Sequence, residues 1–83
     1  MKLFVFAVYD DKAKAFLPPW FMPLKGMAVR TFGDCVNDPK HQFGAHPEDY
    51  NLFTLGSFNS ETGQIDAHLP EVVCTGLEVV RKE

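Results

Sequence analysis

Residues 3–9 read Leu-Phe-Val-Phe-Ala-Val-Tyr, and this short run decides the fold. It is apolar at odd and even positions alike, and it is rich in β-branched and aromatic side chains. A strand with one face in water alternates apolar and polar residues, whereas a strand covered on both faces is apolar throughout. The run therefore predicts a strand over residues 2–10 in the interior of an antiparallel sheet, beside another strand over residues 52–58.

Residues 26–37 carry the clearest helical pattern. One apolar stripe falls at positions i, i+4, i+7 and i+8, occupied by Ala28, Phe32, Cys35 and Val36. Arg30 and Asp34 lie four apart on another face, so we expect them to pair. The helix is expected to end before Pro39, because the residue preceding a proline is pushed out of the helical region.

Turns and extended segments connect these elements. Residues 10–14 are polar and predict a turn, while three prolines within residues 15–23 predict an extended edge or loop. Asp38 and Pro39 suit the N-cap and first position of a short helical turn through Phe43, and residues 46–50 predict another turn.

The second half of the chain predicts strands. Residues 51–59 read as a strand, residues 60–63 as a hairpin loop with Gly63 at a positive φ, and residues 64–69 as a more polar return strand near an edge. Residues 72–74 form a short third run that Gly76 ends, and residues 77–82 fit either a strand or a last helical turn. The prediction is one small α+β domain over residues 1–83: an antiparallel sheet of three to four strands with one main helix packed on it.

The length and charge of the chain limit the classes of function that it can have. With 83 residues, 46% apolar and 23% charged, the chain supports one thin globular core. The net charge of −3 argues against a general DNA-coating protein, which is usually strongly basic. Residues 1–41 nevertheless carry six basic and four acidic side chains, whereas residues 42–83 carry two and seven. A local site for an anionic ligand is therefore expected in the first half only.

The two cysteines, Cys35 and Cys74, do not make a disulfide framework, and no run reaches the 18 apolar residues of a membrane span. The amino-terminal run is short and lacks a small-residue cleavage site, unlike a signal peptide. We therefore expect a soluble intracellular protein with reduced thiols and no membrane contact.

The sequence gives little support for a catalytic site or a metal site. His41, His46 and His68 show no ligand spacing with each other or with the cysteines. Cys35 belongs to the apolar stripe, where a thiol is usually inert, and the six glycines are scattered instead of forming a phosphate loop. The expectation is a protein that is not an enzyme, with no catalytic residues, no metal and no cofactor.

Basic and aromatic residues interleave over nineteen positions. Cations follow phosphates and aromatic faces stack on bases, which is how single-stranded nucleic acid is held. The predicted DNA-binding residues are Lys12, Lys14, Phe16, Trp20, Phe21, Lys25 and Arg30. The prolines make residues 18–21 stiff, so Trp20 and Phe21 are expected to be displayed there. The same apolar stretch is also a candidate anchor for a protein partner, and we expect at least a dimer.

The ordered segments resemble a known family, the small non-structural protein of gokushovirus-type microviruses, which are phages with circular single-stranded DNA. The matching segments are Met-Lys-Leu-Phe (1–4), Lys-Ala-Lys-Ala-Phe-Leu-Pro-Pro-Trp-Phe (12–21), Ala-Val-Arg-Thr-Phe (28–32), Val-Asn-Asp-Pro (36–39), His-Pro-Glu-Asp-Tyr (46–50), Leu-Gly-Ser-Phe (55–58) and Glu-Thr-Gly (61–63). The resemblance covers residues 1 to about 75 in order.

The resemblance implies a non-structural bacteriophage protein in the host cytoplasm that binds DNA in genome replication or packaging. It supplies no catalytic residues. Together with the residue pattern, it makes single-stranded DNA the expected partner. The alternative is an adaptor that engages host or phage replication and assembly proteins without contacting DNA.

Overall fold

The computed structural model describes residues 1–81 and shows a five-stranded antiparallel sheet with one main helix packed on it. The elements in chain order are β1 (Lys2–Asp10), β2 (Ala15–Phe16), β3 (Trp20–Met22), α1 (Lys25–Val36), α2 (Gln42–Ala45), the short 3-10 helix η1 (Pro47–Asp49), β4 (Tyr50–Asn59), β5 (Ile65–Thr75) and α3 (Gly76–Val79). The predicted α+β class is confirmed, with more strand segments than expected.

β1 lies in the interior of the sheet, as its two-sided apolarity predicted. β4 pairs with it along its whole length on one side, and β2 and β3 share its other side. The path of strands is therefore β2-β1-β4-β5, with β3 alongside β1 next to β2. The middle of β1 is buried on both faces: Phe6 and Ala7 point in opposite directions and are 1% and 0% exposed.

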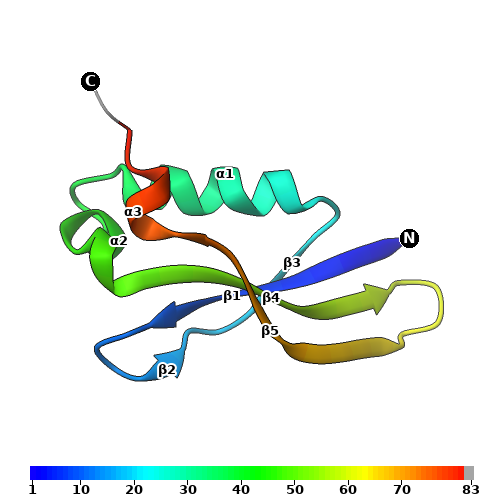
Figure 1. Cartoon of the computed structure of the whole chain (residues 1–83). Coiled ribbons are helices and arrows are strands. Elements are labelled where there is room, and N and C mark those ends of the chain that lie inside the picture. Colours follow the sequence, from blue (N-terminus) through cyan, green and yellow to red (C-terminus); the bar gives the residue numbers. More distant parts are fainter. Residues whose placement is uncertain (82–83) are drawn as a thin grey trace.

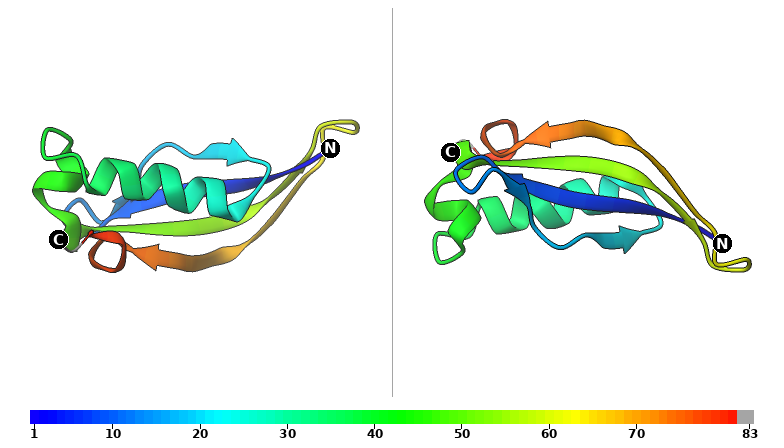
Figure 2. Two further views of the ribbon diagram at one scale, coloured as in Figure 1. Left: turned by 90° about the horizontal axis from the view of Figure 1, so that it is seen from above. Right: turned by 90° about the horizontal axis from the view of Figure 1, so that it is seen from below.

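The core lies between the sheet and α1. The helices cover one face of the sheet, and the other face carries no helix in residues 1–81 (Figure 1; Figure 2). The buried cluster between the two layers is Phe6, Val8, Ala28, Phe32, Val36, Phe43, Tyr50 and Leu52. Three members of the predicted helical stripe belong to this cluster, and the fourth, Cys35, is half-buried and packs against it.

The prediction of two separate runs after the hairpin was wrong, because β5 is one strand that includes them. Its register against β4 shifts twice, which accommodates Pro70 within an edge strand where a missing N–H is tolerated. The hairpin itself is as expected: Gly63 has a φ of 78° and lies in open space.

Two local predictions around α1 were also wrong. Asp34 does not pair with Arg30; its Oδ1 accepts a hydrogen bond from Arg81 Nη2 at 3.0 Å. The turn after the helix is capped not by Asp38 but by His41, whose Nδ1 accepts from the Phe43 N–H at 3.0 Å, so that the helical turn starts three residues later than predicted.

The chain after β5 returns to the helix layer. Residues 76–79 form the short α3, and Thr75 and Glu78 make a capping box at its start. Of residues 77–82, for which strand and helical turn were both open, 77–79 are therefore a helical turn, Val80 and Arg81 follow it outside any helix or strand, and Lys82 lies outside the described residues. Asn37, the C-cap of α1, donates from Nδ2 to the Val79 carbonyl at 2.9 Å and joins the two helices.

Candidate nucleic-acid interface

We call the sheet face turned away from α1 the open face, and most of its side chains are apolar. Cα pairing decides which side chains share it, because paired residues of antiparallel strands point the same way. The register places on it the apolar and aromatic residues Leu3, Val5, Ala7, Tyr9, Phe16, Phe21, Phe53, Phe58, Ile65, Ala67 and Val72, and the polar residues Asn51 and Thr75 at one end. None of these side chains is charged.

Two aromatic clusters lie on the open face. In the first, the Phe16 ring lies 4.9 Å from Tyr9 and 5.4 Å from Phe53, with interplanar angles of 70° and 84°. In the second, Phe21 and Phe58 are 5.6 Å apart at 70°. These edge-to-face arrangements are favourable for aromatic rings and leave parts of the outer rings accessible. Phe16 and Phe21 remain 39% and 45% exposed.

The turn next to the first cluster carries Lys12 and Lys14 together with Asp10 and Asp11. Residues 11–14 connect β1 to β2 directly beyond the paired Tyr9 and Phe16. Asp10 holds this turn, because its Oδ1 accepts from the backbone N–H groups of Lys12 and Ala13 at 3.0 and 3.1 Å. Lys14 Nζ lies 3.2 Å from Asp11 Oδ1 in an exposed pair, which contributes little stability.

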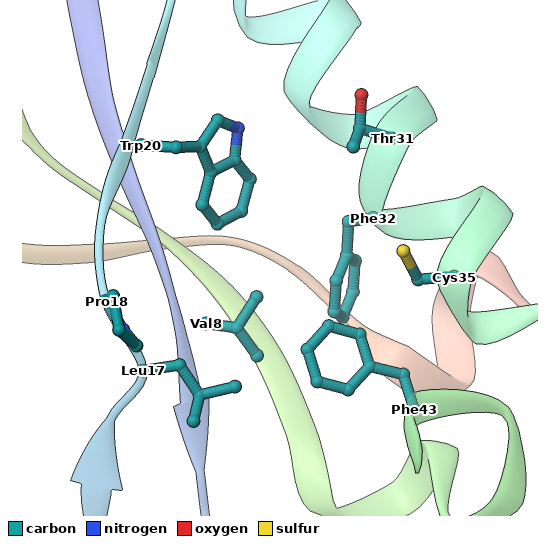
Figure 3. Close-up of a pocket in the computed structure, with 8 residues that line it drawn as sticks. All are labelled: Val8, Leu17, Pro18, Trp20, Thr31, Phe32, Cys35 and Phe43. Atoms are coloured by element: carbon teal, nitrogen blue, oxygen red, sulfur yellow. The ribbon is translucent and has the colours of Figure 1, made fainter. Parts of the chain in front are cut away.

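The seven predicted DNA-binding residues do not form one surface. Phe16 and Phe21 lie on the open face, with Lys12 and Lys14 at its end, whereas Trp20, Lys25 and Arg30 lie on the helix side. Trp20 is not displayed as expected; its ring centroid lies 6.2 Å from that of Phe6, and it is half-buried under α1 (Figure 3). The cause is strand geometry, because consecutive residues of β3 point to opposite faces.

The two basic residues on the helix side are also separated from the open face. Lys25 is the first residue of α1 and lines a hollow with Phe4 and His68. Arg30 is exposed on the same helix, as its place off the apolar stripe predicted. Both belong to α1, which packs on the opposite sheet face from Phe16 and Phe21.

Sequence reasoning missed Tyr9, Phe53 and Phe58 as members of the same surface. Phe53 and Phe58 are five residues apart, and simple alternation would put them on opposite faces. The register of β4 against β1 shifts by one residue between them, and this bulge turns both rings to the open face. Gly56 permits the bulge, since a Cβ there would clash with the Asp66 carbonyl oxygen.

Comparison with known proteins agrees with a phage origin. The model of the family described as phage ORF5 protein matches residues 3–79. The chain belongs to this family. It is 29% identical to Protein ORF5 of Chlamydia phage 1, in an alignment that covers 92% of this chain and 86% of the relative. No solved structure matches this ORF5-family chain significantly.

The family confirms the phage part of the resemblance, and DNA binding stays a prediction. None of the helices of this ORF5-family protein within residues 1–81 is long and apolar enough to cross a membrane.

The thiols of this ORF5-family protein are poorly suited to nucleophilic chemistry. Burial raises the pKa of Cys35, and Asp34 and Asp38 raise it further. Burial also raises the pKa of Cys74, with Glu78 adding to the shift. Both sulfurs are therefore protonated at neutral pH, whereas a nucleophilic cysteine needs a lowered pKa.

One group of potential metal ligands includes His46, for which the spacing in the sequence predicted no metal site. His46, Glu48 and Asp49 bring their ligand atoms within 4.8 Å of one another around η1. His46 and Glu48 are exposed, and the closest charged contact between them is 3.9 Å, so the arrangement is that of solvated side chains on a turn.

Proposed function

We propose that this ORF5-family protein binds single-stranded DNA on its open face. The observation that carries the proposal is the pair of aromatic clusters, each with a ring about two-fifths exposed, on a sheet face without a charged side chain. Unpaired bases present flat π-faces that stack on such rings, at about 1–3 kcal/mol for each base. Base pairs in a duplex are already stacked, so this surface favours single strands.

The distribution of charge supports the same surface. Lys12 and Lys14 at the end of the open face supply cations for phosphates next to the Tyr9–Phe16 cluster. The acidic residues of β5 are turned away, since Asp66 pairs with Ser57 and Glu71 with Thr54, on the helix side of the sheet. The acidic side chains of β5 therefore lie off the proposed contact surface, and the nearest carboxylates to it are those of Asp10 and Asp11 in the turn.

The proposed role is that of a non-enzymatic accessory protein in the host cytoplasm, acting during phage genome replication or packaging. A short aromatic platform with two nearby lysines makes few phosphate contacts. Binding is thus expected to be modest in strength, with a shallow dependence on salt.

Fluorescence anisotropy with a labelled oligothymidine and with a duplex of equal length tests the proposal. We expect the wild type to bind the single strand more tightly at low salt. Phe16→Ser and Phe21→Ser should each weaken binding by about 1–3 kcal/mol. Leu69→Ser is the matched control, because Leu69 is 85% exposed on β5 outside both aromatic clusters. Equal binding by the wild type and both phenylalanine variants contradicts the proposal.

A second candidate is a protein-binding role for the same face. Ile65 and Val72 are 61% and 59% exposed there, and aliphatic side chains without charges are typical of the core of a protein interface. The partner on this face would be a second copy of this chain or a replication or assembly protein. Homo-oligomer formation and the adaptor role therefore remain proposals.

Sedimentation equilibrium separates the two candidates. Self-association through the open face predicts a species heavier than 9.4 kDa at tens of micromolar, and Val72→Glu should restore the monomer. A monomer that binds single-stranded DNA supports the first candidate alone. A dimer that fails to bind DNA supports the second.

A further inference from the structure

This chain exposes more surface than a folded monomer of its mass. A monomer of 9.4 kDa is expected to expose about 5,000 Å², whereas this chain exposes 5541 Å². Within residues 1–81 the helices cover one side of the sheet only (Figure 2). Large exposed apolar side chains lie on both outer sides of the open face, namely Phe16, Phe21, Ile65 and Val72. Contiguous apolar surface of this kind marks a contact site.

The relief of the open face is suited to a second copy of the same face. Val5, Gly56 and Ala67 are paired across β1, β4 and β5 and form a low row of small side chains. On β4 this row lies between Phe53 and Phe58, which belong to the two aromatic clusters. Two copies related by a two-fold axis can each place an aromatic cluster over the low row of the other, because facing layers pack well when large side chains meet small ones.

The edges of the sheet are unsuited to pairing with another chain. Pro19 and Pro23 flank β3 at one edge, and Pro70 lies in β5 at the other. Proline has no N–H to donate to a neighbouring strand, and edge strands use it to prevent pairing between chains. The register of β5 against β4 also shifts twice. A second copy is therefore expected on the face of the sheet and not at its edges.

The size of the open face fits a dimer that dissociates readily. Strands lie about 4.8 Å apart and rise about 3.3 Å per residue, so a sheet four strands wide along β4 presents roughly 600 Å². Two such faces bury roughly 1,200 Å² together, which is the lower limit for specific interfaces and is typical of transient ones.

We propose that a second copy of this chain packs face to face on the open face, and that this contact and single-stranded DNA exclude each other. Like charges do not meet in the contact, because none of the side chains that the register places on the open face is charged. The exclusion rests on the proposed DNA-binding function, since both partners cover the exposed rings of Phe16 and Phe21. The dimer therefore does not bind DNA, and single strands convert it to monomers by mass action.

Ala67→Phe tests the geometry of the contact. Ala67 is exposed and paired with Gly56, so a phenyl ring there covers the glycine, fills the low row and leaves the fold intact. Sedimentation equilibrium should show a concentration-dependent mass above 9.4 kDa for the wild type, and a dissociation constant raised roughly tenfold or more in Ala67→Phe. His68→Phe is the matched control, because it places the same ring on the helix side of β5, where His68 lines a hollow with Lys25.

A trace of labelled oligothymidine titrated with protein tests the exclusion. The free monomer grows only as the square root of total protein once dimers dominate, so the apparent Hill coefficient of the wild type should fall from one towards about one half. Ala67→Phe should give a simple one-site curve with half-saturation at a roughly three- to tenfold lower concentration. Excess oligonucleotide should replace the heavy wild-type species with complexes that hold one chain each.

Four results would overturn the proposal in separate ways. A wild type that stays at 9.4 kDa up to hundreds of micromolar shows that no dimer forms. Equal dissociation constants for Ala67→Phe and His68→Phe place the contact elsewhere. A complex of two chains that keeps its mass with DNA bound shows that the two partners do not compete. A monomeric Ala67→Phe that binds no oligonucleotide refutes the DNA function and the exclusion with it, while sedimentation still decides the face-to-face contact.

Discussion

Trp20 and Phe21 are neighbours in β3, and their side chains point to opposite faces of the sheet. Trp20 pairs with Phe6 and points beneath α1, while Phe21 pairs with Val5 and joins Phe58 on the open face. One short edge strand thus contributes to the core on one side and to the proposed DNA surface on the other. Substitutions at the two positions should therefore affect different properties of the protein.

Trp20→Ala is expected to affect folding and leave DNA binding to the open face intact. Removing a half-buried indole from the core should cost roughly 2–4 kcal/mol and lower Tm by roughly 10 °C or more. Arg30→Ala should change neither property, because its side chain is exposed and lies away from the open face. Circular dichroism melting and anisotropy on both variants check this. Trp20→Ala with wild-type Tm and weakened DNA binding would contradict the assignment.

Lys12→Ala with Lys14→Ala should change the salt dependence of single-strand binding. Each lost phosphate contact reduces the slope of log K against log salt by about 0.7. Lys40→Ala is the control, since Lys40 is an exposed cation in the loop after α1. A double variant with the wild-type slope would remove the turn from the interface.

Gly56→Ala and Gly26→Ala should shift stability in opposite directions. A Cβ at Gly56 meets the Asp66 backbone, which cannot move without breaking the β4–β5 pairing, so a loss of roughly 1–3 kcal/mol is expected. Gly26 lies in α1 with nothing within 4 Å of an added Cβ, and alanine there should gain about 0.5–1 kcal/mol. Urea denaturation measures both. A stable Gly56→Ala protein would show that the bulge does not need glycine.

Asn37 should matter more than the ion pair beside it. Its Nδ2 donates to the carbonyls of Gly33 and Val79, and its Oδ1 accepts from the Arg81 N–H at 2.8 Å. Asn37→Ala should cost roughly 1–3 kcal/mol, because the Val79 carbonyl and the Arg81 N–H lose their partner, while the Gly33 carbonyl keeps the backbone N–H of residue 37. Asp34→Ala breaks only the exposed contact to Arg81 and should cost under about 1 kcal/mol. Chemical denaturation of both variants ranks the two interactions, and equal losses would refute this ranking.

Stability should decline at alkaline pH. Burial raises the pKa values of Cys35, Cys74 and Tyr50 in the folded state, so unfolding releases protons once the pH passes their ordinary values. Well below about pH 8.5, the ordinary pKa of a thiol, these groups are protonated in both states and contribute little pH dependence. Thermal melting from pH 7 to pH 11 should show a falling Tm above that point, and the Cys74→Ala variant should fall less steeply. A flat profile in the wild type would contradict the buried environment of these groups.

Much of the local structure could be predicted from short-range patterns. The apolar run at residues 3–9 indicated a strand in the interior of the sheet, and the middle of β1 is buried on both faces although no helix within residues 1–81 covers the open face. The spacing of Ala28, Phe32 and Val36 indicated the main helix, and Gly63 indicated the hairpin. Each of these features depends on neighbours within a few residues, and so the sequence by itself determined it.

Only the tertiary structure decided which side chains lie together on the candidate surface. Strand pairing placed Trp20 and Phe21 on opposite faces, and the bulge at Gly56 brought Phe53 and Phe58 to the same one. Asp34 accepts a hydrogen bond from Arg81, which is 47 positions away in the sequence, and does not pair with Arg30, which is four positions away. Register, bulges and long-range partners depend on how separate segments pack together, and a one-residue shift in register moves every following side chain to the other face of the sheet.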